Sequence, residues 1–286
     1  MKRIIILFLA CTLWASVSYA AIVAKKVNYE EGGQKLQGVL YYDNTVEAAK
    51  PGVIVFHEWM GLGEYAKKRA MMLAKQGYAA FAADMYGAGI FADSHEKAAE
   101  LSGVYFKDRN KMRARAKAAM DAFIRTGYAD EFNLSAIGYC FGGTTVLEMA
   151  RAGFPLKGVV SFHGILATPA PAEAGAVKAK VLVFNGAEDA MISAKDRQSF
   201  EEEMRKAGAD WQFVNLGGAQ HSFTVWEANM PEKGIVYSAA ADKRSWAGLR
   251  LFLNEVMVKP LRLPPAPKIE DITKPSAAES DPIISQ

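Results

Sequence analysis

The sequence predicts an α/β fold in which a mostly parallel central sheet carries helices on both faces. Short, continuous apolar runs such as Gly52–Phe56 and Lys180–Phe184 are typical of strands that are buried on both faces. Segments with helical spacing alternate with these runs, which indicates parallel strands joined by crossover helices. The third observation is a glycine-flanked turn around Cys140, placed between a predicted strand and a predicted helix.

The chain is predicted to begin with a hairpin. Val23–Tyr29 and Lys35–Tyr42 alternate weakly on either side of Gly32-Gly33, and the strand Gly52–Phe56 follows. Further strands are expected at Tyr78–Ala83, Leu134–Ile137, Val159–Phe162, Lys180–Phe184 and Trp211–Leu216, and helices at about 64–76, 94–126, 144–150, 194–206 and 237–256. In such sheets the chemistry gathers at the carboxyl ends of the strands, so site residues are expected just after them.

Residues 1–20 are predicted to be a secretory signal peptide. Two basic residues precede the apolar run Ile4–Ala10, and the small residues before Ala21 predict cleavage after Ala20. The run is too short to span a membrane. A lipoprotein signal around Cys11 is a weaker alternative, because very few apolar residues precede that cysteine. We therefore expect a periplasmic or secreted protein.

Residues 21–258 are long enough to form one α/β domain, and residues 259–286 are predicted to be a Pro-rich tail. Six of the 11 prolines fall in the last 27 residues, with no apolar periodicity between them. Without the leader, the chain keeps 32 of 34 basic residues and all 31 acidic ones, which gives a formal charge of +1. Such a balance does not attract nucleic acid. We expect a monomer that acts on a small molecule.

Cys140 is the single cysteine of the predicted mature chain, and it stands in Gly138-Tyr139-Cys140-Phe141-Gly142-Gly143. In a nucleophile elbow, small flanking residues let a strand reverse into a helix and push the nucleophile above the sheet edge. Most free cysteines instead pack as small hydrophobes. Here the strand, turn and helix context favours a catalytic thiol, as does the liability of an unused thiol in an oxidising compartment.

Asp189 and His221 are the candidate partners of that thiol, because each follows a predicted strand. Their order, nucleophile then acid then base, fits a triad in which the carboxylate orients the imidazole. Asp189 could instead be a turn or helix-cap residue, and Glu188 leaves the assignment ambiguous by one position. Of the four histidines, His221 alone has the expected late position.

Two backbone N–H groups are expected to form an oxyanion hole. One belongs to Phe141, the residue after the nucleophile, and the other is expected from Trp59 in the loop after the early strand.

Four segments together resemble the dienelactone hydrolase family, from about residue 25 to 257. They are His57-Glu58-Trp59-Met60-Gly61-Leu62, Ala83-Asp84-Met85-Tyr86-Gly87, the Cys140 elbow, and His221-Ser222-Phe223. The resemblance implies an α/β-hydrolase fold and a triad of Cys140, His221 and Asp189. It also implies that Glu58 can contact the thiol and assist its deprotonation when an anionic substrate displaces the carboxylate.

The chain also departs from that family. Members that act on dienelactone carry arginines that hold the substrate carboxylate, whereas His221-Ser222-Phe223 is followed here by Thr224-Val225-Trp226 and residues 94–106 contain no arginine. The resemblance therefore does not identify the substrate. An aromatic pocket of Tyr86, Phe91 and Trp226 is expected to bind it, although single aromatic residues usually pack in cores.

The sequence thus predicts an exported hydrolase that cleaves an ester or lactone, with a thioester as a further chemical option, through an acyl-cysteine intermediate and without a cofactor. The alternative is a non-catalytic binding or redox-sensing protein that uses Cys140 as an oxidisable thiol. A metal-dependent hydrolase with His57, Glu58 and His163 as ligands is a third option, which the absence of ligand spacing disfavours.

Overall fold

The computed structural model describes residues 21–45 and 48–258. The predicted signal peptide and the predicted Pro-rich tail lie outside these residues. Among the helices described, none combines the length and the apolar character that a membrane span requires.

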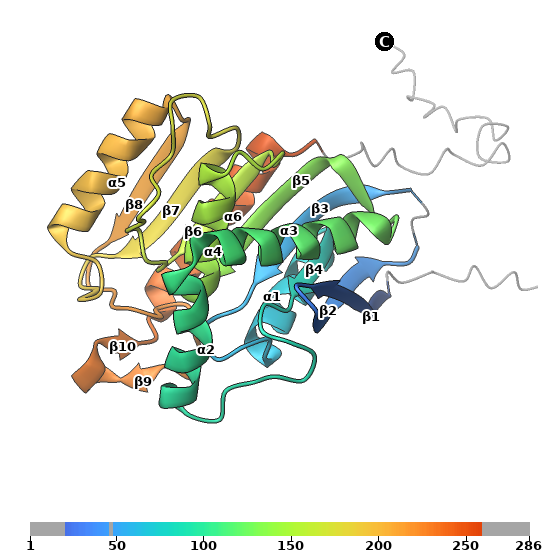
Figure 1. Cartoon of the computed structure of the whole chain (residues 1–286), viewed down its shortest axis with the longest axis horizontal. Helices are drawn as coiled ribbons and strands as arrows, with labels where there is room; N and C mark the ends of the chain where they lie inside the picture. Colours follow the sequence, from blue (N-terminus) through green and yellow to red (C-terminus); the bar gives the residue numbers. More distant parts are fainter. Residues whose placement is uncertain (1–20, 46–47, 259–286) are drawn as a thin grey trace, which may run out of the picture.

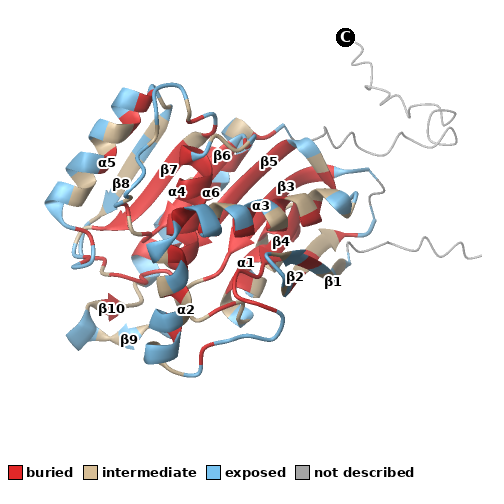
Figure 2. Cartoon of the chain, viewed as in Figure 1, coloured by how far each residue is buried: buried red, intermediate tan, exposed pale blue. Residues whose placement is uncertain are grey.

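An eight-stranded sheet forms the centre of the domain, with the strand order β1-β2-β4-β3-β5-β6-β7-β8. The strands are β1 (Ile22–Glu31), β2 (Gln34–Asp43), β3 (Lys50–Phe56), β4 (Ala79–Ala83), β5 (Ala129–Tyr139), β6 (Gly158–Phe162), β7 (Lys180–Gly186) and β8 (Trp211–Leu216). The β1–β2 hairpin pairs antiparallel with the rest, and the strands from β4 to β8 run parallel. Side chains of β3, β4 and β6 are buried along their whole length, as continuous apolar runs predict (Figure 2).

Helices cover both faces of the sheet (Figure 1). They are α1 (Glu64–Ala74), α2 (His95–Lys107), α3 (Arg109–Arg125), α4 (Phe141–Arg151), α5 (Ala194–Ala207) and α6 (Ala239–Val256). Buried side chains of α1 and α6 pack in one cluster, and those of α3, α4 and α5 pack in a second cluster on the opposite face. The predicted fold class, an α/β-hydrolase fold with helices on both faces, is confirmed.

The expectation of one helical region over residues 94–126 is wrong, because the helix is interrupted at Asp108. This residue has extended backbone angles, with φ −127° and ψ 95°, and ends α2. Its carboxylate accepts the N–H of Lys111 at 3.0 Å and so caps α3. Apolar periodicity continues through both helices, so the periodic signal alone does not show the break.

A small hairpin after residue 228 was not predicted. It consists of β9 (Asn229–Met230), a turn of 3₁₀ helix (Pro231–Lys233) and β10 (Ile235–Val236). Strands of two residues are too short to show alternation in a sequence. The hairpin nevertheless matters, because it lies against the loop that carries His221.

Candidate active site

Cys140 lies directly after β5, in a backbone conformation that its neighbours make possible. Its φ of 52° and ψ of −111° turn the chain from the strand into α4. A Cβ at Gly138 would lie 2.0 Å from the carbonyl oxygen of Gly142, and one at Gly142 would lie 2.3 Å from that of Phe56. Glycine is therefore required at both positions, and the tight turn leaves the Cys140 side chain partly exposed.

The structure brings Cys140, His221 and Asp189 together at the carboxyl ends of the strands. His221 Nε2 lies 3.2 Å from Cys140 Sγ, and His221 Nδ1 lies 2.9 Å from Asp189 Oδ2. His221 and Asp189 are buried, whereas the neighbouring Glu188 is exposed to solvent. Asp189, rather than Glu188, is thus the carboxylate in contact with the imidazole.

The contacts of His221 stabilise its positively charged form. Burial lowers the pKa of the imidazole, but Cys140 and the hydrogen-bonded Asp189 carboxylate outweigh burial and raise this pKa to about 10. An imidazolium ring at hydrogen-bond distance from the sulfur favours the thiolate, which is the nucleophilic form of cysteine.

The unpredicted hairpin holds the backbone of His221. The N–H of His221 donates to the carbonyl of Gly234 at 3.0 Å, and the N–H of Val236 donates to the carbonyl of His221 at 3.1 Å. These two bonds continue the β10 ladder onto the residue that carries the imidazole. The position of the base therefore depends on a hairpin that contributes only backbone hydrogen bonds and carries none of the predicted site residues.

The two predicted oxyanion donors lie in the loops next to the elbow. Phe141 is the first residue of α4, where backbone N–H groups have no intrahelical acceptor. Its ring is fully buried and stacks on His57 at a centroid distance of 5.8 Å. The carbonyl of Trp59 accepts the hydroxyl of Tyr86 at 3.0 Å, which fixes the loop that carries the second candidate donor.

Glu58 is half-buried and lines a cavity of about 270 Å³ together with Phe91, Val225 and Glu227. Burial raises the pKa of the Glu58 carboxyl to about 7; His221 and Arg69 oppose this shift and Glu227 adds to it. Glu58 can therefore change its protonation state near neutral pH, within electrostatic reach of the candidate base.

The three aromatic residues expected to bind substrate lie in different places. Tyr86 is buried, and burial together with Cys140 raises the pKa of its hydroxyl. Phe91 is 54% exposed and lines the cavity beside Glu58. The ring of Trp226 packs on Tyr65 at 5.0 Å and over the guanidinium of Arg69 at 4.7 Å. Tyr86 and Phe91 thus line different cavities, and Trp226 packs against α1.

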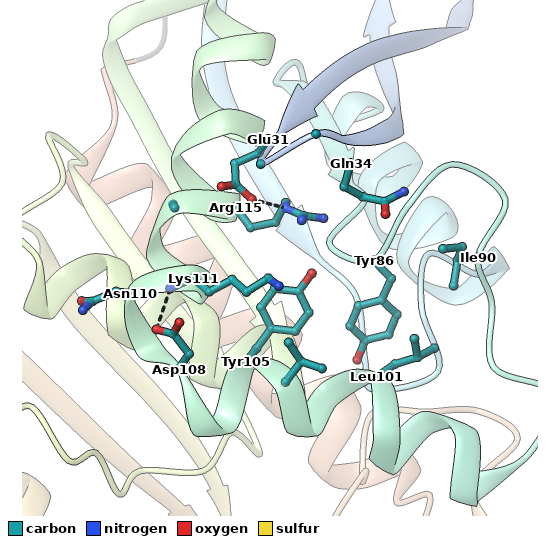
Figure 3. Close-up of a pocket in the computed structure, with 14 residues that line it drawn as sticks. Glu31, Gln34, Tyr86, Ile90, Leu101, Tyr105, Asp108, Asn110, Lys111 and Arg115 are labelled. Carbon is teal, nitrogen blue, oxygen red and sulfur yellow. Dashed lines mark hydrogen bonds and ion pairs between the residues drawn. The ribbon is translucent and has the colours of Figure 1, made fainter.

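A larger cavity, of about 730 Å³, lies between the β1–β2 turn and helices α2 and α3 (Figure 3). Tyr86 and Tyr105 line it, and an ion pair of 2.8 Å between Glu31 and Arg115 lies at its edge. No residue of the candidate triad lines this cavity. Tyr86 is the one predicted site residue that belongs to it.

His163 contacts the elbow rather than a set of metal ligands. Its Nδ1 accepts the N–H of Cys140 at 3.2 Å, and its Nε2 lies 2.8 Å from Thr224 Oγ1. In the described part of the chain, no three His, Cys, Asp or Glu side chains are arranged to hold a metal ion. From the sequence, His163 is a candidate only for metal binding, although its place directly after β6 is a signal that could link it to the elbow.

Comparisons with known proteins agree with this architecture. A dienelactone hydrolase-like promiscuous phosphotriesterase from metagenomic libraries is 38% identical, covers 83% of this chain and 100% of its own, and superposes with a TM-score of 0.78. "Protein usf" of Aquifex pyrophilus is 30% identical over 70% of this chain and 87% of its own. A protein of Aquifex aeolicus, provisionally named carboxymethylenebutenolidase, is 29% identical over the same shares.

The model of the dienelactone hydrolase family matches residues 36–257, which span every residue of the candidate triad. The chain belongs to the dienelactone hydrolase family and is an ester or lactone hydrolase.

Proposed function

We propose that this protein hydrolyses a carboxylic ester or lactone through a covalent acyl-cysteine intermediate. The observation that carries the proposal is the pair of contacts that joins Cys140 to Asp189 through His221. His221 Nε2 lies 3.2 Å from Cys140 Sγ and His221 Nδ1 lies 2.9 Å from Asp189 Oδ2, and Cys140 stands at a strained turn. Membership of the dienelactone hydrolase family supports the same reaction class.

In the acylation step, the Cys140 thiolate attacks the carbonyl carbon, and the carbonyl oxygen takes up the negative charge. The N–H groups of Phe141 and Trp59 are the proposed donors to that oxygen. The tetrahedral intermediate collapses with loss of the alcohol, which takes its proton from the His221 imidazolium. In a lactone the alcohol stays attached to the acyl group.

Deacylation returns the enzyme to its starting state. Neutral His221 removes a proton from water, the resulting hydroxide attacks the acyl-cysteine, and the acid leaves while Cys140 is regenerated as a thiolate beside the imidazolium. Asp189 accepts a hydrogen bond from His221 Nδ1 and stabilises the imidazolium in each half of the reaction. A burst of chromophore from an activated aryl ester, equal in amount to the enzyme, tests this two-step scheme.

Glu58→Gln is expected to lower turnover and to shift the dependence of Cys140 alkylation on pH. The pKa of Glu58 is raised to about 7, so the carboxyl is neutral below that pH and ionised above it. We expect a corresponding inflection in kcat/KM for the parent, absent from Glu58→Gln. Glu227→Gln removes a repelling charge and should move the inflection to lower pH. Unchanged turnover and alkylation curves in Glu58→Gln would leave this carboxyl with no part in the chemistry.

Neutral esters are expected to be better substrates than esters with a carboxylate on the acyl chain. The cavity beside Glu58 also contains Glu64 and Glu227, and no lysine or arginine lines it; burial lowers the pKa of His57, the one histidine in its lining. A second negative charge would meet repulsion there. Values of kcat/KM for 4-nitrophenyl butyrate and the 4-nitrophenyl monoester of succinate test this at low salt. Faster turnover of the succinate ester would contradict it.

A further inference from the structure

A chain of buried hydrogen bonds joins the backbone of the nucleophile to the loop of the base. The N–H of Cys140 is shared between the carbonyl of Phe162, at 3.0 Å, and Nδ1 of His163, at 3.2 Å. Because a backbone N–H can only donate, Nδ1 must be the unprotonated nitrogen of His163. Its Nε2 therefore carries the proton and donates to Thr224 Oγ1 at 2.8 Å. Thr224 stands three residues after His221.

The same threonine is anchored to α1 from its other side. The hydroxyl of Tyr65 donates to Thr224 Oγ1 at 2.7 Å, and Arg69 donates to the Thr224 carbonyl at 2.9 Å and to the Tyr65 hydroxyl at 3.1 Å. Arg69 is 2% exposed and forms an ion pair with Asp242 of α6. The His221 loop is thus fixed to two helices on one face of the sheet.

Backbone strain is concentrated at the same place. In the described part of the chain, the non-glycine residues with positive φ are Cys140 (52°), His163 (41°) and Ser222 (56°). One is the candidate nucleophile, one is its hydrogen-bond partner, and one follows the candidate base. Such conformations are strained and persist only where surrounding contacts hold them.

The charge state of His163 suits this role. Burial, the His221 ring and Arg69 all lower the pKa of His163 well below its usual value. The ring is therefore neutral, as an acceptor at Nδ1 must be. A neutral ring also avoids repulsion with the imidazolium of His221, whose centroid lies 5.2 Å away.

We infer that His163 and Thr224 are positioning residues whose hydrogen bond sets the distance between Cys140 Sγ and His221 Nε2. The inference rests on the proposed function of the Cys140–His221 pair. The hydrogen bond between His163 and Thr224 acts through geometry: one end holds the strained elbow, and the other holds the loop that carries the imidazole. Loss of the bond lets the thiol and its base separate without removing either.

Thr224→Val tests the inference with a side chain of nearly the same shape. We expect kcat for an activated aryl ester to fall about 10- to 100-fold, because a displacement of about 1 Å in a reacting group has effects of this size. KM is expected to change little, since neither residue is proposed to touch substrate. Thr145→Val is the matched control: Thr145 is equally buried, and its hydroxyl bonds the Phe141 carbonyl within its own helix. It should keep the kcat of the parent.

His163→Asn removes the same hydrogen bond from its other end. Asparagine tolerates positive φ and retains a carbonyl acceptor near the Cys140 N–H, but it cannot reach Thr224. If the two residues act through one bond, the double variant His163→Asn/Thr224→Val should be no slower than the slower single variant. Losses in kcat that multiply would show that the residues act independently, which would overturn the inference.

Alkylation of Cys140 by iodoacetamide, followed against pH, separates this inference from the proposed function. Thr224→Val and His163→Asn are expected to need a higher pH for the same alkylation rate, because the imidazolium no longer stabilises the thiolate equally well. This readout does not require esterase activity, so it still tests the positioning role if no ester is cleaved. Folded variants with the parent's alkylation profile and kcat would overturn the inference.

Discussion

Replacing Cys140 with alanine is expected to lower kcat/KM for an activated ester by at least about 10⁴-fold, as the loss of a triad nucleophile does in other hydrolases. The melting temperature should change little, because the side chain is partly exposed and the turn is built by the glycines around it. Steady-state hydrolysis and thermal unfolding of the same preparation measure both effects.

Cys140→Ser is the stringent companion variant. It keeps a nucleophilic atom in place, but an alcohol is far harder to deprotonate than a thiol, so turnover should also be severely impaired. Activity of Cys140→Ala within tenfold of the parent would rule out the covalent mechanism. It would also favour the alternative in which Cys140 is an oxidisable thiol on a non-catalytic protein.

Asp189→Asn is expected to lower kcat by about 10³- to 10⁴-fold, because the carboxylate orients the imidazole and stabilises its charged form. Asp189 raises the pKa of His221, so its loss should lower that pKa and let the ring lose its proton at a lower pH. The pH dependence of Cys140 alkylation reports the change.

Glu188→Gln is the matched control for that variant, because Glu188 is adjacent in sequence, carries the same charge and is exposed. It should retain the activity of the parent. If Glu188→Gln proved the damaging change and Asp189→Asn were harmless, the acid of the triad would have to be reassigned by one residue.

The sequence predicts the sheet and the elbow because both leave local signals. Buried parallel strands such as β3 read as unbroken apolar runs, and the elbow needs glycine at positions 138 and 142 for steric reasons that hold in any chain. The break at Asp108 leaves a weaker signal, because a capping aspartate looks like any other polar residue on a helix surface.

The side chains that hold Thr224 in place leave almost no signal in the sequence. Arg69 and Thr224 are 155 positions apart, and Tyr65 and Thr224 are 159 apart. Each is a common residue type on a helix or in a loop, and only the packing of α1 against the His221 loop brings them into contact. Residues of this kind can be identified only once the fold has placed them together.

An acyl-cysteine intermediate adds the acyl group to the mass of Cys140, and mass spectrometry of the quenched reaction detects that addition. The enzyme is mixed with an excess of 4-nitrophenyl butyrate, quenched in acid during the burst, digested and mapped. We expect a butyryl mass increase on the peptide that contains Cys140, in proportion to the burst, and none in Cys140→Ala. Ester turnover by the parent with an unmodified Cys140 peptide at every quench time, or the same adduct on another residue, would contradict it.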